Sequence, residues 1–173
     1  STSKDSVFID AREKAPSNAS RDMYLDNDGN VIRRASLDGP MASGIPGLPA
    51  ALHHIAKNHG TMPLYRLLQP AIRLAREGFP AYERLVTAVM IADKSKSLSP
   101  KFKEIFMPNG KPPVVGQIIR QPELAKTLEV LASSGHTGFY DSFFTQKMVE
   151  ESNQDGSIWQ SDDFKSYSVT ERA

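Results

Sequence analysis

The hydrophobic positions of this chain recur at helical spacing over most of its length. One such face lies between the Pro46-Gly47 dipeptide and Gly60 and consists of Leu48, Ala51, Leu52, Ile55, Ala56 and His59. It predicts a helix over 48–59, because proline favours the first turn of a helix and glycine commonly follows the last. The same spacing predicts further helices at 64–75, 85–90, 124–132 and 139–151. Pro70 lacks a backbone donor, so we expect the stretch that contains it to form two short helices.

Strand signals lie near the two ends of the chain. The residues at 7–9 are β-branched or aromatic and charged residues follow them, which predicts a strand over 7–12. From Tyr167 onward, Tyr167, Val169 and Glu171 alternate with serine, threonine and arginine. We expect a strand there that is cut short at Ala173. Few other strands are available as partners for the first one. We therefore expect the isolated chain to self-associate through these strands or to leave one of them disordered.

Turn and cap residues separate the predicted elements. Glycine and asparagine within 26–30 lie between two apolar runs, which favours a hairpin-like reversal there. Ser99 before Pro100 has the pattern of a helix N-cap followed by the first helical residue. Gly135 is expected to end the helix over 124–132. The stretches at 93–99 and 109–116 are rich in lysine, serine, proline and glycine and are predicted to be loops.

These elements predict an α+β chain that is mostly helical. Its 173 residues are 39% hydrophobic and 24% charged, which is enough to bury one sizeable core. The helices on either side of each predicted loop are too short and amphipathic to form separate cores. We therefore interpret residues 1–173 as one partial domain.

Charge and composition exclude several classes of protein. The net charge of +1 favours neither a nucleic acid nor an anionic membrane surface as a partner. The absence of cysteine excludes a disulfide framework, a thiol nucleophile and cysteine-ligated zinc. No apolar run approaches the length of a membrane span. The first six residues lack both an initiator methionine and the apolar core of a signal peptide, so we expect an excised segment.

The first predicted strand delivers Arg12 and Glu13 to a chain reversal marked by Pro16. Under a two-residue period Arg12 lies on the same face as Asp10. A guanidinium presents a rigid fork of donors that matches a carboxylate, so an arginine at a strand end can anchor an acidic small molecule. The alternative from spacing alone is a structural ion pair, which is the more common fate of such an arginine.

Ordered blocks along the whole chain resemble the large subunit of gamma-glutamyltransferase (gamma-glutamyltranspeptidase). The first block is Phe8-Ile9-Asp10-Ala11-Arg12-Glu13-Lys14-Ala15-Pro16, and the third is Ala42-Ser43-Gly44-Ile45-Pro46-Gly47-Leu48-Pro49-Ala50-Ala51-Leu52. The other blocks lie at 22–26 with 29–32, 62–64, 67–72, 74–80, 124–128, 138–140 and 163–164 with Tyr167. A series of this length in the right order is a specific signal, although each block alone would be weak.

The resemblance implies a segment of the αββα sandwich of the amino-terminal-nucleophile hydrolases. In that family a precursor cleaves itself, and the new amino-terminal threonine of the small subunit attacks a gamma-glutamyl amide such as glutathione. Its own amine serves as the base, and the acyl-enzyme passes its glutamyl group to water, an amino acid or a dipeptide. This chain matches neither the amino-terminal part of the large subunit nor the catalytic small subunit, so we expect no catalytic residue in it and no activity from it alone.

The resemblance also implies the site residues, partners and compartment. Arg12 matches the family arginine that grips the substrate's α-carboxylate, and Glu13 is a weaker neighbouring candidate. The expected partners are the small subunit of the same precursor and gamma-glutamyl substrates, without cofactor or metal. The family's location would be periplasmic or extracellular. The alternative is a free-standing helical binding or scaffold module without catalytic activity.

Two further features bear on the site and on local geometry. His53, His54 and His59 could suggest a metal site, but adjacent helical residues point to different sides and an i,i+5 pair does not share a face. We therefore expect solvated or capping histidines. Ser142 stands where the family usually has glycine, and Trp159 is larger than its usual counterpart. The serine would matter only where the backbone needs a positive φ or a close approach.

Overall fold

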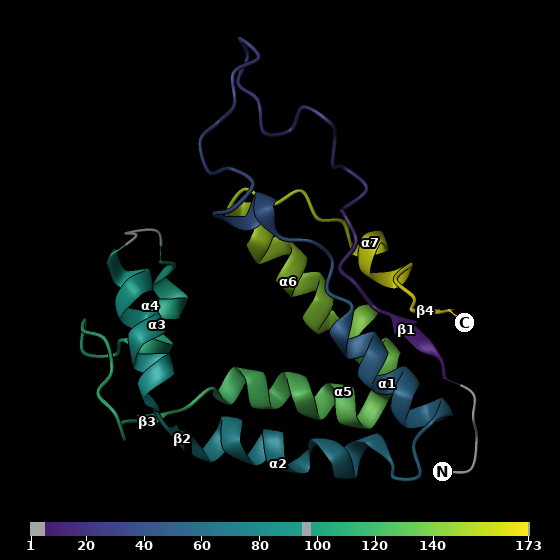
Figure 1. The fold of residues 1–173 in the computed structure, drawn as a ribbon. Coiled ribbons are helices and arrows are strands. Elements are labelled where there is room, and N and C mark those ends of the chain that lie inside the picture. Colours follow the sequence, from purple (N-terminus) through teal and green to yellow (C-terminus); the bar gives the residue numbers. More distant parts are fainter. Residues whose placement is uncertain (1–5, 95–97, 173) are drawn as a thin grey trace. The chain divides into compact units, whose positions relative to one another are not determined.

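The computed structural model describes residues 6–94 and 98–172 (Figure 1). Their contacts divide them into two compact units. The first unit contains the described residues up to Arg66 together with those from Val130 onward, and the second is Leu67–Glu129. The interpretation of 1–173 as one partial domain stays a prediction.

Helices account for most of the regular structure, which confirms the mostly helical α+β prediction. The elements in chain order are β1 (Phe8–Asp10), the 3-10 turn η1 (Pro40–Ala42), α1 (Leu48–Asn58), α2 (Leu64–Glu77), β2 (Phe79–Pro80), α3 (Glu83–Lys94), α4 (Pro100–Phe106), β3 (Ile118–Ile119), α5 (Pro122–Tyr140), α6 (Phe143–Gln154), α7 (Ser161–Lys165) and β4 (Thr170–Arg172). Within the described residues, no helix is both long and apolar enough to cross a membrane.

In the first unit, β1 pairs with β4 in an antiparallel ladder, so the strands from the two ends of the chain lie side by side (Figure 1). The register places Phe8 opposite Arg172 and Asp10 opposite Thr170. The Arg172 guanidinium also donates to the Asp10 carboxylate at 2.7 and 3.0 Å. Few strands were expected as partners for the first one, and the strand at the other end of the chain supplies that partner. Self-association stays a prediction.

The second unit contains a two-residue ladder between β2 and β3, in which Phe79 lies opposite Ile119. Strands this short leave no periodic signal in the sequence, so they were not predicted. Helix α2 continues through Pro70, so the expected break is wrong. Its buried residues Leu68, Ile72 and Ala75 lie on one stripe, and burying that stripe favours an unbroken helix over two separate ones.

The helix caps and interruptions largely agree with those predicted from the sequence. Ser99 accepts a hydrogen bond from the Phe102 backbone N–H at 3.1 Å and begins α4, as predicted. Gly135 has φ 59° and ψ −139°, so it interrupts the helical geometry of α5. A Cβ atom there would lie 2.5 Å from the His53 ring, so both the backbone conformation and the close approach favour glycine. The loop predicted at 109–116 is confirmed. The loop predicted at 93–99 is wrong for residues 93–94, which belong to the last turn of α3, and its residues 95–97 lie outside the described part.

The predicted helix over 139–151 is divided at Ser142, which begins α6. Its φ of −136° is extended, and its hydroxyl accepts a hydrogen bond from the Thr145 N–H at 3.4 Å. This position therefore requires no glycine, and the serine adds a cap.

The core of the first unit is centred on Tyr140, which is 0% exposed. Its ring stacks on His136 and on Tyr167, with centroid distances of 4.5 and 5.4 Å. Its hydroxyl donates to the Pro46 carbonyl at 2.6 Å and accepts from the Ala50 N–H at 3.2 Å. Burial raises the pKa of this phenol far above its ordinary value. Tyr140 thus satisfies buried backbone groups at the start of α1, which has no side-chain cap.

Candidate functional site

The backbone around Arg12 is held from two directions within the first unit. The Tyr167 hydroxyl donates to the Arg12 carbonyl at 2.7 Å. Gly47 lies so close to this segment that a Cβ atom on it would be 2.1 Å from the Ala11 carbonyl oxygen. Gly47 has φ −104°, so the close approach, and not an unusual backbone angle, is what requires glycine here. The main chain that carries Arg12 is therefore fixed by tertiary contacts.

The Arg12 side chain, in contrast, is 82% exposed. Its guanidinium donates to Glu13 at 2.8 Å, and the Glu13 side chain is 56% exposed. Exposed ion pairs of this kind contribute little to stability, because water screens them and both side chains lose freedom. The two residues predicted as site residues thus lie together, on a rigid backbone and open to solvent.

Asp10 is not the ion-pair partner of the Arg12 side chain. Its carboxylate is held by Arg172 and also accepts the Arg12 backbone N–H at 3.3 Å. The hydrogen bond from Arg172 is the main reason that the pKa of Asp10 is lowered, and the Arg12 N–H adds to it. The strand register therefore pairs Asp10 with Arg172 within the β1–β4 ladder, and the guanidinium of Arg12 pairs with Glu13 instead.

Lys14 supplies a second positive charge near Arg12 that was not predicted from the sequence. Its ammonium lies 4.9 Å from the centre of the Tyr167 ring and donates to the Ser168 carbonyl at 3.4 Å. Its backbone exchanges hydrogen bonds with Ile45 at 3.1 and 2.8 Å. The contacts with Tyr167 and Ser168 join residues more than 150 positions apart, so no local pattern could have revealed them.

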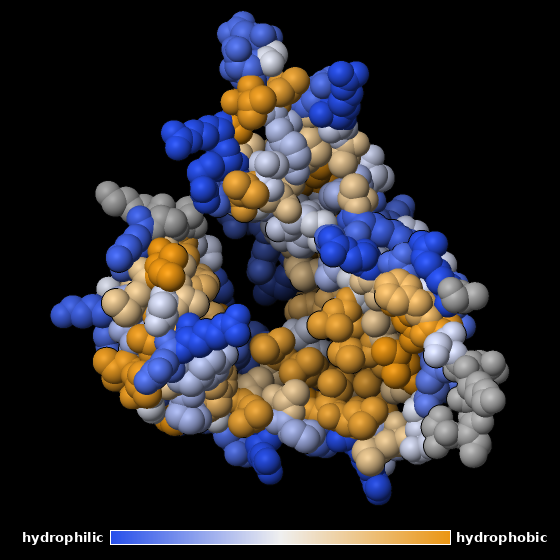
Figure 2. All heavy atoms as spheres, viewed as in Figure 1, coloured by the Kyte–Doolittle hydropathy of each residue, from blue (hydrophilic) through white to orange (hydrophobic). Residues whose placement is uncertain are grey.

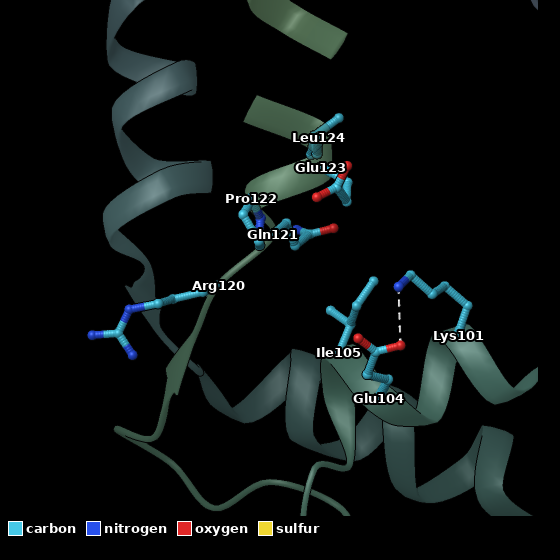
Figure 3. A pocket seen from close by; sticks show the side chains of 8 residues that line it. All are labelled: Lys101, Glu104, Ile105, Arg120, Gln121, Pro122, Glu123 and Leu124. Carbon is cyan, nitrogen blue, oxygen red and sulfur yellow. Dashed lines mark hydrogen bonds and ion pairs between the residues drawn. The ribbon is translucent and has the colours of Figure 1, made fainter. Parts of the chain in front are cut away.

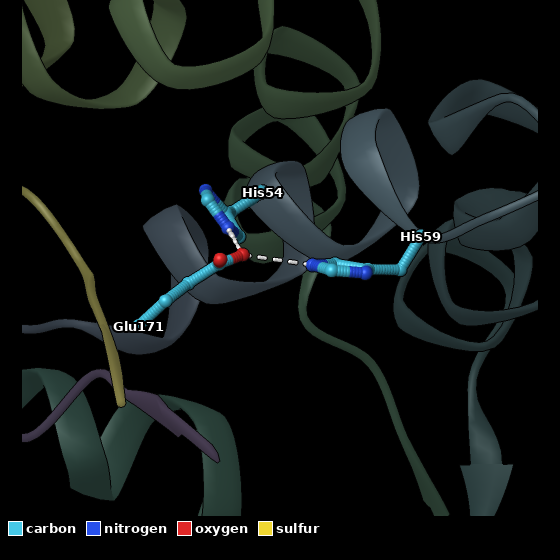
Figure 4. A group of neighbouring side chains, drawn as sticks. All are labelled: His54, His59 and Glu171. Atoms are coloured by element: carbon cyan, nitrogen blue, oxygen red, sulfur yellow. Dashed lines mark hydrogen bonds and ion pairs between the residues drawn. The ribbon is translucent and has the colours of Figure 1, made fainter. Parts of the chain in front are cut away.

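His54 and His59 converge on one carboxylate, contrary to the expectation that they are solvated or capping side chains. The Nε2 atoms of His54 and His59 lie 2.7 and 2.8 Å from Oε1 of Glu171 (Figure 4). His59 follows the last residue of α1 and has φ −126° and ψ −11°, so it has left the helical path. The i,i+5 argument fails because it assumes that the helix continues through His59.

His53 points elsewhere, against Gly135, and helps to line a small cavity of about 230 Å³ in the same unit. The other lining residues are Ala50, His54, Lys57, Asn58, His136, Ser168 and Val169. Burial and the nearby positive charge of Lys57 lower the pKa of His53, which favours a neutral imidazole. The cavity adjoins the cluster of His54, His59 and Glu171.

A second cavity, of about 190 Å³, lies in the second unit where α4 meets the segment that leads into α5 (Figure 3). Its lining residues are Lys101, Glu104, Ile105, Arg120, Gln121, Pro122, Glu123 and Leu124. Lys101 and Glu104 pair with each other at 2.9 Å across one helical turn, and the Arg120 guanidinium points away from this pair in Figure 3. Lys101 and Glu104 thus compensate each other, and the described lining residues show no constellation for catalysis.

Comparison with known proteins places the chain in a family. The family model described as gamma-glutamyltranspeptidase matches residues 1–173. The glutathione hydrolase proenzyme of Escherichia coli (strain K12) is 36% identical over 171 residues, which cover 95% of this chain and 28% of that protein. Glutathione hydrolase 3 of Arabidopsis thaliana is also 36% identical, over 98% of this chain and 26% of that protein.

A solved structure agrees with this relationship. The crystal structure of Helicobacter pylori gamma-glutamyltranspeptidase matches 95% of this chain and 47% of its own, with a TM-score of 0.90 and 33% identity. The mostly helical segment described above is thus a segment of the amino-terminal-nucleophile hydrolase fold, as expected. The chain spans a little more than a quarter of the length of the curated relatives it matches. It belongs to the gamma-glutamyltranspeptidase family.

Proposed function

We propose that this chain is a segment of the large subunit of a gamma-glutamyltransferase and that it contributes scaffold and a substrate-binding arginine. In the proposed reaction a precursor-derived small subunit supplies the threonine nucleophile and forms the gamma-glutamyl enzyme. The acyl group then passes to water, an amino acid or a dipeptide. Glutathione is the proposed donor, and the chain alone would be inactive. A periplasmic or extracellular location stays a prediction.

The observation that carries the proposal is the contrast between the fixed backbone and the free side chain of Arg12. Tyr167 and Gly47 hold the backbone, while the guanidinium has an exposed neighbour, Glu13, as its ion-pair partner. A substrate α-carboxylate can replace such a partner at little cost. Two donors of the guanidinium would then grip both carboxylate oxygens and place the gamma-glutamyl carbonyl for attack.

Glu13 would complete the recognition of an α-amino acid. When its carboxylate is released by Arg12, it can accept a hydrogen bond from the substrate's ammonium group. The adjacent arginine and glutamate would then complement the two charges of the zwitterion. Glu13 is proposed as the weaker contributor because it is one short, exposed acceptor, whereas Arg12 offers a bidentate contact.

Exposed apolar residues support a further partner for the first unit. In Figure 2 they gather over α1, whose Leu48 and Ile55 are 66% and 43% exposed. Clustered apolar surface of this kind is typical of an interface. The small subunit of the same precursor is the partner that we propose.

The test is Arg12→Lys in the precursor that contains this chain, with a chromogenic gamma-glutamyl anilide and glutathione as substrates. We expect kcat/KM to fall by an amount equivalent to roughly 2 to 5 kcal/mol, the range for a charged pair that the bound substrate and the small subunit bury, because an ammonium cannot reproduce the paired donors. Autoprocessing, followed on a denaturing gel, should be unchanged. The matched control is Arg21→Lys, since Arg21 is almost fully exposed and has only a 3.7 Å contact with Asp22. Normal kinetics in a fully processed Arg12→Lys enzyme would assign Arg12 to a structural pair.

A further inference from the structure

We propose that His54, His59 and Glu171 form a binding site for a divalent transition metal of the zinc type. The donor atoms of the three side chains all lie within 4.8 Å of one another. His54 comes from α1, His59 from the residue that follows it, and Glu171 from β4 (Figure 4). The site thus draws on two elements that are far apart in the sequence, and an ion in it would join β4 to α1.

The chemistry of the donor set matches zinc better than magnesium or calcium. Two imidazole nitrogens and one carboxylate oxygen suit Zn²⁺, whereas the two lighter cations prefer oxygen ligands. Three protein ligands leave a fourth position of the tetrahedron for water. Because zinc bonds are about 2.0–2.2 Å long, tetrahedral donors lie about 3.4 Å apart, so each imidazole nitrogen must move away from Oε1 of Glu171, from which it now lies 2.7 or 2.8 Å. The two imidazole nitrogens, which lie within 4.8 Å of each other, must come to the same separation.

The partial exposure of the cluster permits this adjustment and gives an ion access. The side chains of His54, His59 and Glu171 are 24%, 39% and 43% exposed. Small rotations of His59 and Glu171 can open the cluster without disturbing packed atoms. One oxygen of the Glu171 carboxylate already contacts both imidazoles. The attraction that holds the imidazoles would act on a dication as well.

Asn58 gives the site an outer support. Its amide nitrogen lies 3.1 Å from Nδ1 of His54 and 3.4 Å from Nε2, the atom that contacts Glu171. When Nε2 of His54 binds a metal, the ring proton resides on Nδ1 and can be donated to the amide oxygen of Asn58 after a rotation of that group. Such an acceptor fixes the tautomer and the orientation of a metal-binding imidazole.

The position of the site gives binding a structural consequence. Glu171 lies opposite Ile9 in the β1–β4 ladder, and Arg172 next to it holds Asp10. An ion that joins Glu171 to α1 would therefore stabilise the ladder from which the Arg12 segment emerges. This consequence follows whether or not Arg12 binds substrate.

The direct test is calorimetric titration of the 173-residue chain, prepared without a histidine tag, with ZnCl₂ at pH 7.5. We expect one zinc ion per chain and micromolar or tighter affinity, together with a higher melting temperature in the presence of zinc. His54→Ala, His59→Ala and Glu171→Gln should each weaken binding at least tenfold. Glu171→Gln preserves the shape of the side chain, so it separates loss of a ligand from loss of folding.

The matched control is His53→Ala, which removes a neighbouring histidine of the same helix whose ring contacts Gly135. Its zinc affinity should equal that of the unmodified chain. Co²⁺ is a second probe, because a four-coordinate site produces strong visible absorption that His59→Ala should abolish. MgCl₂ should produce no heat. Absence of stoichiometric zinc binding, or equal loss of affinity in His53→Ala and His59→Ala, would overturn the proposal.

Discussion

The close approach of Gly47 to the Arg12 segment makes Gly47→Ala the sharpest test of this structure. A Cβ atom at Gly47 would lie 2.0 Å from the Tyr167 hydroxyl and 2.1 Å from the Ala11 carbonyl oxygen. Both atoms would have to move by more than 1 Å to reach ordinary contact distances. The backbone angles of Gly47 suit alanine, so any destabilisation comes from this overlap.

The expected magnitude follows from what has to move. Forcing extra volume into a packed site costs about 1–3 kcal/mol. Displacing Tyr167 also breaks its 2.7 Å hydrogen bond to the Arg12 carbonyl, which adds about 1 kcal/mol. We therefore expect Gly47→Ala to lower the free energy of unfolding by about 2–4 kcal/mol.

Urea unfolding of the 173-residue chain, followed by far-ultraviolet circular dichroism, measures this difference. The control is Gly156→Ala, where φ is 94° and no atom lies within 4 Å of the added Cβ, so only backbone strain of about 1 kcal/mol applies. Combining Gly47→Ala with Tyr167→Phe should relieve only the contact with the hydroxyl, so the two changes should not be additive. If Gly47→Ala is no more destabilising than Gly156→Ala, the described packing around Ala11 and Arg12 is refuted.

Three other changes test separate parts of the first unit. Tyr140→Phe leaves the Ala50 N–H and the Pro46 carbonyl without their buried partner. It should lower the free energy of unfolding in urea by about 2–4 kcal/mol, and an unchanged midpoint would contradict the two hydrogen bonds. Ser142→Ala should lower the free energy of unfolding by about 1 kcal/mol and Ser142→Gly by only a few tenths of that. Calorimetric melting can distinguish the two changes, and equal losses would argue against the cap. The lowered pKa of Asp10 stabilises the folded state above the ordinary aspartate pKa, and this contribution is lost as pH falls through the folded pKa. The protection factors of the β1 amides against hydrogen exchange should therefore fall below about pH 4 in the unmodified chain, and Asp10→Asn should flatten that dependence, with a parallel profile in both proteins contradicting the assignment.

Local sequence patterns determined most of the helices and several of their boundaries, although α7 was not predicted. The apolar spacing from Leu48 to Ile55 identifies α1. Ser99 marks a helix start through the hydrogen bond that its side chain accepts, and Gly135 marks a helix interruption through a positive φ that glycine tolerates. These signals are readable because they act within one or two helical turns. The ordered blocks along the chain likewise identified the family, since they depend on residue identity alone.

Tertiary structure decided the features that join distant residues. Pro70 remains inside α2 because burial of a continuous apolar stripe outweighs one missing backbone donor. The partner of β1 is β4, from the opposite end of the chain, and no local period encodes that pairing. The sequence shows that Pro70 removes a backbone donor and that residues 7–12 favour a strand. It does not show that α2 stays unbroken or that β4 pairs with that strand.

Each candidate site also has features that the sequence shows and features that only the tertiary structure decides. The guanidinium of Arg12 and its place at a strand end are properties of the sequence, whereas its fixed backbone depends on Tyr167 and Gly47. His54 and His59 look divergent on an ideal helix. They meet at Glu171 because α1 ends before His59 and the β1–β4 register carries that carboxylate to them. The sequence by itself supplied the chemical groups and the local elements, and long-range packing decided which groups meet.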